Sequence, residues 1–102
     1  MNKAFIIVAS IFLIGTTAIA QVPNPALVGY WHNWNDVSAP YIQLDQVDPR
    51  YNMVYIAFAV PQAGTDYNME LIPDQVTPAT LINQIQTLQS QGTKVIISIG
   101  GA

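Results

Sequence analysis

The residue of this sequence whose type and surroundings most suggest chemistry is a serine, Ser98, inside an otherwise apolar run. Residues 94–99, KVIISI, are rich in β-branched side chains, a composition typical of a strand buried on both faces of a parallel sheet. A buried hydroxyl requires a hydrogen-bond partner. The glycines that follow, Gly100 and Gly101, allow a sharp turn or a close approach of the backbone to a ligand. From spacing alone, a role of the Ser98 hydroxyl in a functional site and a hydrogen bond to neighbouring backbone are equally favoured.

A second group of suggestive side chains is the polar and aromatic stretch 31–35, WHNWN, which follows another apolar segment. Its tryptophans, Trp31 and Trp34, are candidates for stacking on pyranose rings, with the neighbouring amides bonding sugar hydroxyls. The alternative is a structured loop whose tryptophans pack against the rim of the fold. One histidine, His32, and no cysteine make a poor metal site, so we predict neither a metal nor another cofactor.

The first twenty residues have the features of an export signal. Lys3 precedes an apolar run over residues 4–14, and Ala18-Ile19-Ala20 is a small-x-small cleavage site. The alternative is a membrane anchor, but a spanning helix needs roughly 20 consecutive apolar residues, and polar residues and a glycine interrupt this run. We therefore expect a signal peptide, residues 1–20, and a folded domain within residues 21–102. The protein would be secreted, extracellular or periplasmic, and free of the membrane after cleavage.

The charge of the remaining 82 residues narrows the partners. Two basic side chains, Arg50 and Lys94, stand against six acidic ones, which gives a formal charge of −4. This balance disfavours nucleic acids and anionic lipids and leaves a neutral ligand such as a sugar open. Small exported domains usually need disulfides, and this sequence has no cysteine, so we expect its core to be completed by a longer chain.

The order of predicted elements is that of an α/β protein. We expect strands over residues 27–31, 53–60 and 94–99, a short helix over 41–47, and a loop over 62–77. A longer helix is predicted after that loop, with Thr77 as N-cap, Pro78 in the first turn, Gly92 as C-cap, and an apolar stripe formed by Leu81, Ile82, Ile85 and Leu88. Alternating strands and helices indicate a parallel sheet.

The alternation of side chains along these strands predicts which of them meet. Ser98 shares a face with Ile96, Tyr30 with Val28, and Phe58 with Val54 and Ile56. If the face of Ser98 is the one without helices, Tyr30, Phe58 and Ser98 fall near the C-terminal ends of neighbouring strands. Active sites of parallel α/β folds form at those ends. Taken alone, a strand phenylalanine such as Phe58 is more often core packing.

Three strand segments together resemble the opening of the family-18 glycoside hydrolases, the retaining chitinases. They are VGYW at 28–31, YIAFA at 55–59 and KVIISIGG at 94–101, of which SIGG matches the S-x-G-G motif of that family. The resemblance covers residues 27–102 and implies a (β/α)8 TIM barrel with only the first three β/α units in this chain. It also implies chitin or N-acetylglucosamine oligosaccharides as substrate.

The resemblance further implies substrate-assisted retaining catalysis, an exception to the scheme with two protein carboxylates. A glutamate in a D-x-x-D-x-D-x-E motif protonates the glycosidic oxygen, and the acetamido oxygen of the substrate attacks the anomeric carbon. By position in the family, Tyr30 and Ser98 would support the aspartates of that motif. Phe58, with Gly100 and Gly101, would line the pocket around the cleaved sugar.

The sequence departs from the family in one decisive respect, because the acidic motif is absent from these 102 residues. Their single glutamate, Glu70, has no D-x-D ahead of it, so we assign no catalytic acid within this chain. We expect the N-terminal part of a secreted chitinase that is inactive by itself. The alternatives are an endo-β-N-acetylglucosaminidase of the same fold, a non-catalytic chitinase-like lectin, and an unrelated small α/β domain.

Overall fold

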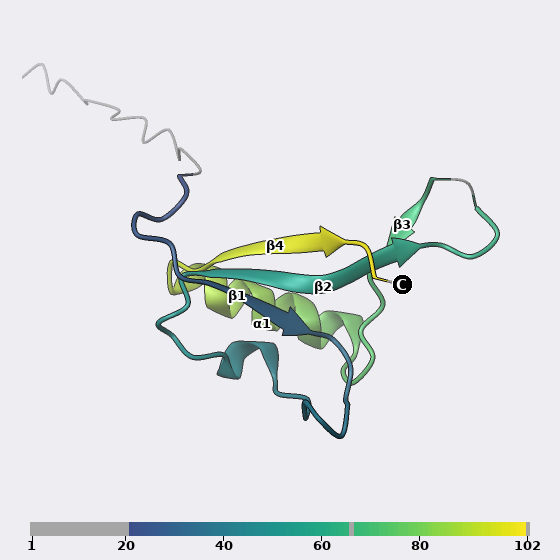
Figure 1. The fold of residues 1–102 in the computed structure, drawn as a ribbon, viewed down its shortest axis with the longest axis horizontal. Coiled ribbons are helices and arrows are strands. Elements are labelled where there is room, and N and C mark those ends of the chain that lie inside the picture. Colours follow the sequence, from purple (N-terminus) through teal and green to yellow (C-terminus); the bar gives the residue numbers. More distant parts are fainter. Residues whose placement is uncertain (1–20, 66, 102) are drawn as a thin grey trace, which may run out of the picture.

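The computed structural model describes residues 21–65 and 67–101, so the predicted signal peptide lies outside the described residues. Along the chain the elements are β1 (Val28–His32), the short 3-10 helix η1 (Leu44–Gln46), β2 (Met53–Pro61), β3 (Met69–Glu70), α1 (Pro78–Ser90) and β4 (Lys94–Ile99). Figure 1 shows one twisted sheet with α1 and η1 on the same face of it. The predicted mixture of strands and helices is confirmed.

Strand β2 is the centre of the sheet. β1 pairs with it in parallel on one side, with Tyr30 opposite Tyr55, and β4 pairs with it in parallel on the other side. The continuous apolar run of β2 is typical of a central strand in a parallel sheet, and residues on both of its faces, such as Ile56 and Ala57, are buried. β3, which was predicted as loop, pairs antiparallel with the end of β2 through Val60 and Glu70. The resulting hairpin projects beyond the rest of the sheet (Figure 1).

Helix α1 begins and ends where the sequence predicts. The Thr77 side chain caps it by accepting a 3.2 Å hydrogen bond from the backbone N–H of Thr80. At the other end Gly92 adopts a φ of +88°, and its N–H donates to the carbonyl of Gln89. The Thr93 N–H donates to the carbonyl of Leu88 at 3.1 Å, which completes a Schellman motif. Glycine suits this position because it has no Cβ to oppose a positive φ.

The predicted apolar stripe of α1 is only partly correct. Leu81 and Leu88 are buried, but Ile82 is 54% exposed and the polar side chain of Gln84 is buried instead. Positions 81, 84 and 88 are three and four residues apart and therefore share one helix face, whereas position 82 lies to the side of it. The helix consequently presents a narrower apolar face to the sheet than its composition indicates.

The short helix predicted over 41–47 is reduced to the three residues of η1. Gln43 is extended and its side chain makes no cap hydrogen bond, so this segment lacks the side-chain cap that would favour a longer helix. The apolar residues of this segment are used separately: Leu44 is fully buried, and Tyr41 packs edge-on against Trp31, with ring centroids 5.7 Å apart. The segment thus serves to cover the core.

The core lies between the sheet and the two helical segments. Its buried cluster consists of Trp31, Leu44, Val54, Ile56, Leu81 and Leu88. The opposite face of the sheet has no helix on it within the described residues, and Tyr30 is 69% exposed there. The described residues form an open sheet and not a closed barrel. No helix in them is long and apolar enough to cross a bilayer.

Candidate substrate-binding site

Two of the predicted site residues, Tyr30 and Ser98, lie on the face of the sheet that α1 leaves uncovered. Tyr30 stands opposite Tyr55 in the register and stacks on it, with ring centroids 5.2 Å apart and an angle of 27° between the planes. Ser98 stands opposite Ala57, two positions further along β2 on the same face. The shared face of Tyr30 and Ser98 agrees with the alternation argument.

For Phe58 the regular alternation along β2 is interrupted. Val54 and Ile56, with which it should share a face, are buried in the core on the side of α1. The pairing of β2 with β4 is irregular here: Ala57 is opposite Ser98, and Ala59 is opposite the next residue, Ile99. Phe58 is therefore an extra residue in β2, and such an irregularity redirects a side chain out of strict alternation.

Phe58 instead belongs to an aromatic pair at the C-terminal end of the sheet. Its ring lies roughly parallel to that of Trp34, with centroids 6.0 Å apart and an angle of 26°. Trp34, just past the end of β1, is 41% exposed, so its ring is accessible to a ligand. Offset parallel rings of this kind form a stable apolar surface.

The glycine pair after β4 completes this end of the sheet. Both glycines have positive φ, 142° at Gly100 and 89° at Gly101. A Cβ on Gly101 would lie 3.0 Å from Cδ2 of Phe58, so the backbone approaches that ring more closely than other residues allow. The predicted close approach is thus made to an aromatic side chain of the site.

These groups surround a hollow of about 470 Å³ at the C-terminal end of the sheet. Its lining consists of Asn33, Trp34, Phe58, Val60, Asp74 and Gly101. Three of these residues, Trp34, Phe58 and Gly101, were predicted from the sequence. Tyr30 lines a separate hollow of about 500 Å³ beside Asp48 and Tyr51. Ser98 and Gly100 line neither, so the described residues bring together only part of the predicted site.

Trp31, the second tryptophan predicted to stack on sugar, does not have that role in this structure. It is 3% exposed and packs in the core, and its indole Nε1 donates a 2.9 Å hydrogen bond to the carbonyl of Ile42. Adjacent residues of a strand point to opposite faces, and this parity places Trp31 on the helix side. The packing alternative therefore holds for Trp31, while the exposed ring of Trp34 remains a candidate.

Asn33 and Asp74 were not identified as a pair by the sequence. Asn33 is 7% exposed, its Nδ2 donates to the carbonyl of Ile72 at 2.6 Å, and its Oδ1 accepts from the N–H of Asp74 at 3.3 Å. Both polar groups of this amide bond backbone, so Asn33 ties the segment of Ile72 and Asp74 to the end of β1. The two segments are about forty residues apart in the chain, and no local pattern predicts their contact.

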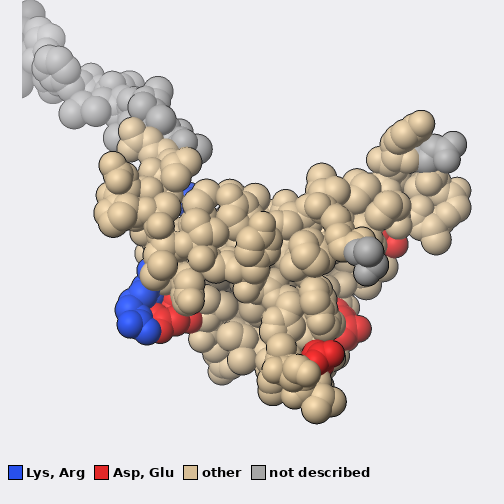
Figure 2. All heavy atoms as spheres, in the orientation of Figure 1, with Lys and Arg blue, Asp and Glu red and all other residues tan. Residues whose placement is uncertain are grey.

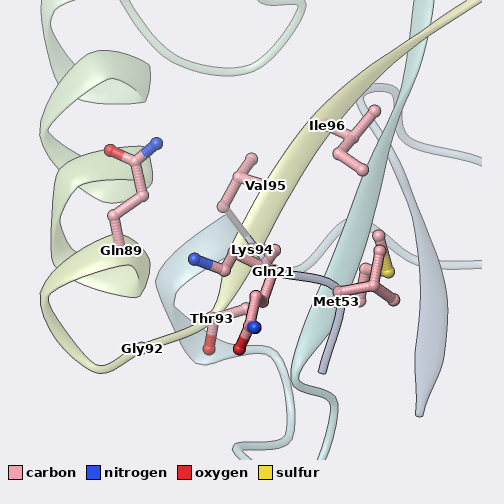
Figure 3. A pocket seen from close by; sticks show the side chains of 9 residues that line it. Gln21, Met53, Gln89, Gly92, Thr93, Lys94, Val95 and Ile96 are labelled. Atoms are coloured by element: carbon pink, nitrogen blue, oxygen red, sulfur yellow. The ribbon is translucent and has the colours of Figure 1, made fainter. Parts of the chain in front are cut away.

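A further hollow of about 470 Å³ lies at the opposite end of the sheet. Figure 3 shows it around the start of β4, with Lys94, Val95 and Ile96 on that strand and Met53 at the start of the neighbouring β2. The N-terminal ends of parallel strands are not where α/β sites form, and none of the predicted site residues lines this hollow. We therefore place the candidate site at the aromatic end.

Asp74 is the one charged side chain among the residues that line the candidate site. On the face shown in Figure 2 the charged atoms are few and lie toward the margins. The one ion pair of the described residues, Arg50 to Asp48 at 2.7 Å, is on the exposed surface. Hydrogen bonds from Arg50 lower the pKa of the Asp48 carboxyl to about 2. Residues 21–65 and 67–101 contain no cluster of side chains that could hold a metal ion.

Comparison with known proteins shows what the chain is similar to. No protein-family model matches the chain. Chitinase Chi52 of Paenibacillus xylanexedens is 38% identical over 76 residues, which cover 74% of this chain and 14% of that protein. Chitinase D of Niallia circulans is 34% identical over 93 residues, or 87% of this chain and 18% of that protein. The chain thus spans less than a fifth of the length of these two relatives.

A solved structure is also similar to this chain, and it too is that of a chitinase. A family GH18 chitinase from Chromobacterium violaceum superposes with a TM-score of 0.66 and 35% sequence identity, covering 74% of this chain and 20% of that one. The parallel strands of this chain and these likenesses both point to the family GH18 chitinases as the proteins it resembles. The chain is a family GH18 chitinase-like segment.

Proposed function

We propose that this chain forms the first strands of the catalytic (β/α)8 barrel of a secreted chitinase. The observation that carries the proposal is the hollow at the C-terminal ends of parallel strands, where Phe58 stacks on the accessible ring of Trp34 beside Gly101. An apolar ring surface with a few polar groups at its edge suits a sugar. The identity to curated chitinases supports chitin or N-acetylglucosamine oligosaccharides as the substrate.

In this proposal the residues of the chain bind and orient, and the proton comes from elsewhere. Trp34 and Phe58 hold one sugar ring by stacking, and the hydroxyls of Tyr30 and Ser98, on the uncovered face, bond the acidic groups that orient the acetamido arm. The single glutamate, Glu70, pairs with Val60 in the projecting hairpin. It does not follow a D-x-D, so the general acid must come from sequence other than these 102 residues.

The open sheet supports the proposal that these residues are inactive alone. Ile97 and Ile99 of β4 are 49% and 71% exposed, and Tyr30 is 69% exposed on the other edge strand. Apolar strand edges of this kind normally require a partner. We expect the isolated 102-residue chain to show no cooperative unfolding transition.

The direct test compares the isolated chain with the intact protein that carries this sequence. The intact protein should release the fluorophore from a chitobiose derivative, and the isolated chain should not. Release by the isolated chain would contradict the assignment of the acid to another part. Absence of hydrolysis by the intact protein, with chitin binding retained, would favour the lectin. For export, N-terminal sequencing of the mature protein should begin at Gln21.

A further inference from the structure

The segment between β3 and α1 crosses the C-terminal end of β1 and is held there by Asn33. As described above, the buried amide of Asn33 donates to the carbonyl of Ile72 at 2.6 Å and accepts from the N–H of Asp74 at 3.3 Å. A buried amide that satisfies both its groups with backbone fixes that backbone, since moving it would leave a buried polar group unpaired. The position of Asp74 relative to β1 is therefore set by Asn33.

The carboxylate of Asp74 is exposed and has capacity to bond a ligand. One of its oxygens, Oδ2, accepts a 2.8 Å hydrogen bond from Nε2 of Gln75, which is the only hydrogen bond to this carboxylate within residues 21–65 and 67–101. An ionised carboxylate can accept about four hydrogen bonds. Asp74 lines the same hollow as Trp34 and Phe58, so its free acceptor positions border the aromatic surface.

An exposed aromatic ring, Trp34, beside a carboxylate, Asp74, suits the recognition of a sugar ring. A pyranose has an apolar face of C–H groups and a rim of hydroxyls, and it needs a ring beneath it and an acceptor beside it. We propose that Asp74 accepts a hydrogen bond from a hydroxyl or amide N–H of an N-acetylglucosamine unit stacked on Trp34. We further propose that Asn33 is the positioning residue that holds Asp74 there. This inference rests on the proposed function and adds a binding contact to it.

The test uses the intact protein and chitotetraose, with binding followed by quenching of tryptophan fluorescence. Charge-assisted hydrogen bonds are among the stronger polar contacts, so Asp74→Ala should raise the dissociation constant about tenfold or more. Asn33→Ala should raise it in the same direction. The double variant should bind no more weakly than Asp74→Ala alone, because Asn33 acts through Asp74. A purely structural Asn33 would instead give additive losses.

The chain offers a matched control for Asn33. Asn52 also bonds backbone with both its amide groups, accepting from the N–H of Leu27 and donating to the carbonyl of Pro25, each at 2.9 Å. It lies at the N-terminal end of β2, away from the hollow. Asn52→Ala should lower the thermal midpoint and leave the dissociation constant unchanged. If Asn33→Ala does not fold, Asn33→Leu, which has a similar volume and cannot accept from the Asp74 N–H, takes its place.

The possible results distinguish a failure of this inference from a failure of the proposed function. If Asp74→Ala binds chitotetraose within twofold of wild type, the inference about Asp74 is overturned, and the proposed chitinase function is unaffected. A wild-type protein that binds chitotetraose without hydrolysing it would refute the proposed chitinase activity. The variants would still show whether Asp74 contributes to sugar binding. A wild-type protein that does not bind chitotetraose would overturn both.

Discussion

Replacing Gly101 by alanine should disturb the candidate site and the stability of the protein together. Gly101 has a φ of +89°, and holding a residue other than glycine in that region costs about 1–3 kcal/mol. The new Cβ would also lie 3.0 Å from Cδ2 of Phe58, so the ring must move. Gly92 is a matched control, because its φ is +88° and a Cβ there meets nothing within 4 Å.

Gly101→Ala should have a further effect, on stability and on affinity for sugar, because its Cβ displaces the ring of Phe58. Phe58 stacks on Trp34 with a centroid distance of 6.0 Å, and an aromatic pair of this kind contributes about 0.5–1.5 kcal/mol. If a bound sugar depends on that arrangement, its loss corresponds to a decrease in affinity of up to about tenfold. Gly92→Ala leaves the aromatic pair in place, so it should lose only the stability that alanine costs at a positive φ.

The assay measures the urea midpoint and the KM for a chitobiose substrate on the intact protein carrying each variant. Both variants should lower the midpoint, Gly101→Ala by more than Gly92→Ala, and only Gly101→Ala should raise KM. Equal KM values for the two variants would refute the argument that Gly101 is glycine in order to accommodate Phe58. A smaller loss of stability in Gly101→Ala than in Gly92→Ala would contradict it as well.

Four shorter predictions concern the framework around the site, and each is measured on the intact protein that carries this sequence. Leu44→Ala should lower the free energy of unfolding by about 2–5 kcal/mol in urea denaturation, because this side chain is fully buried. Ile82→Ala, at a position that is 54% exposed, should change it by less than about 1 kcal/mol, and a loss as large as that of Leu44→Ala would contradict the exposure of Ile82. Thr77→Ala removes the cap of α1 and should cost about 1 kcal/mol, measured in the same way. In an NMR titration the Asp48 carboxyl should have a midpoint of about 2, and Arg50→Gln should return it toward 3.8. Because the folded pKa is lowered, the contribution of this pair to stability is present above about pH 4 and is lost as the pH falls toward 2.

The sequence by itself determined the elements that depend on local patterns. The strand over 94–99 and the ends of α1 were predictable, since β-branched runs, an N-cap threonine and a glycine with positive φ act within a few residues. The family resemblance was carried by motifs inside these elements, which is why the comparisons agree with it. The shared face of Tyr30 and Ser98 followed from alternation along regular strands.

Only the tertiary structure decided where alternation stops and which distant segments meet. The irregular pairing beside Phe58 moves its ring to Trp34, and it arises from how β4 joins β2, which no local pattern encodes. Trp31 and Trp34 have the same residue type three positions apart, yet one is buried under α1 and the other faces the hollow. The contact of Asn33 with Asp74 joins segments about forty residues apart, and its hydrogen bonds form only after the sheet has brought both to one end.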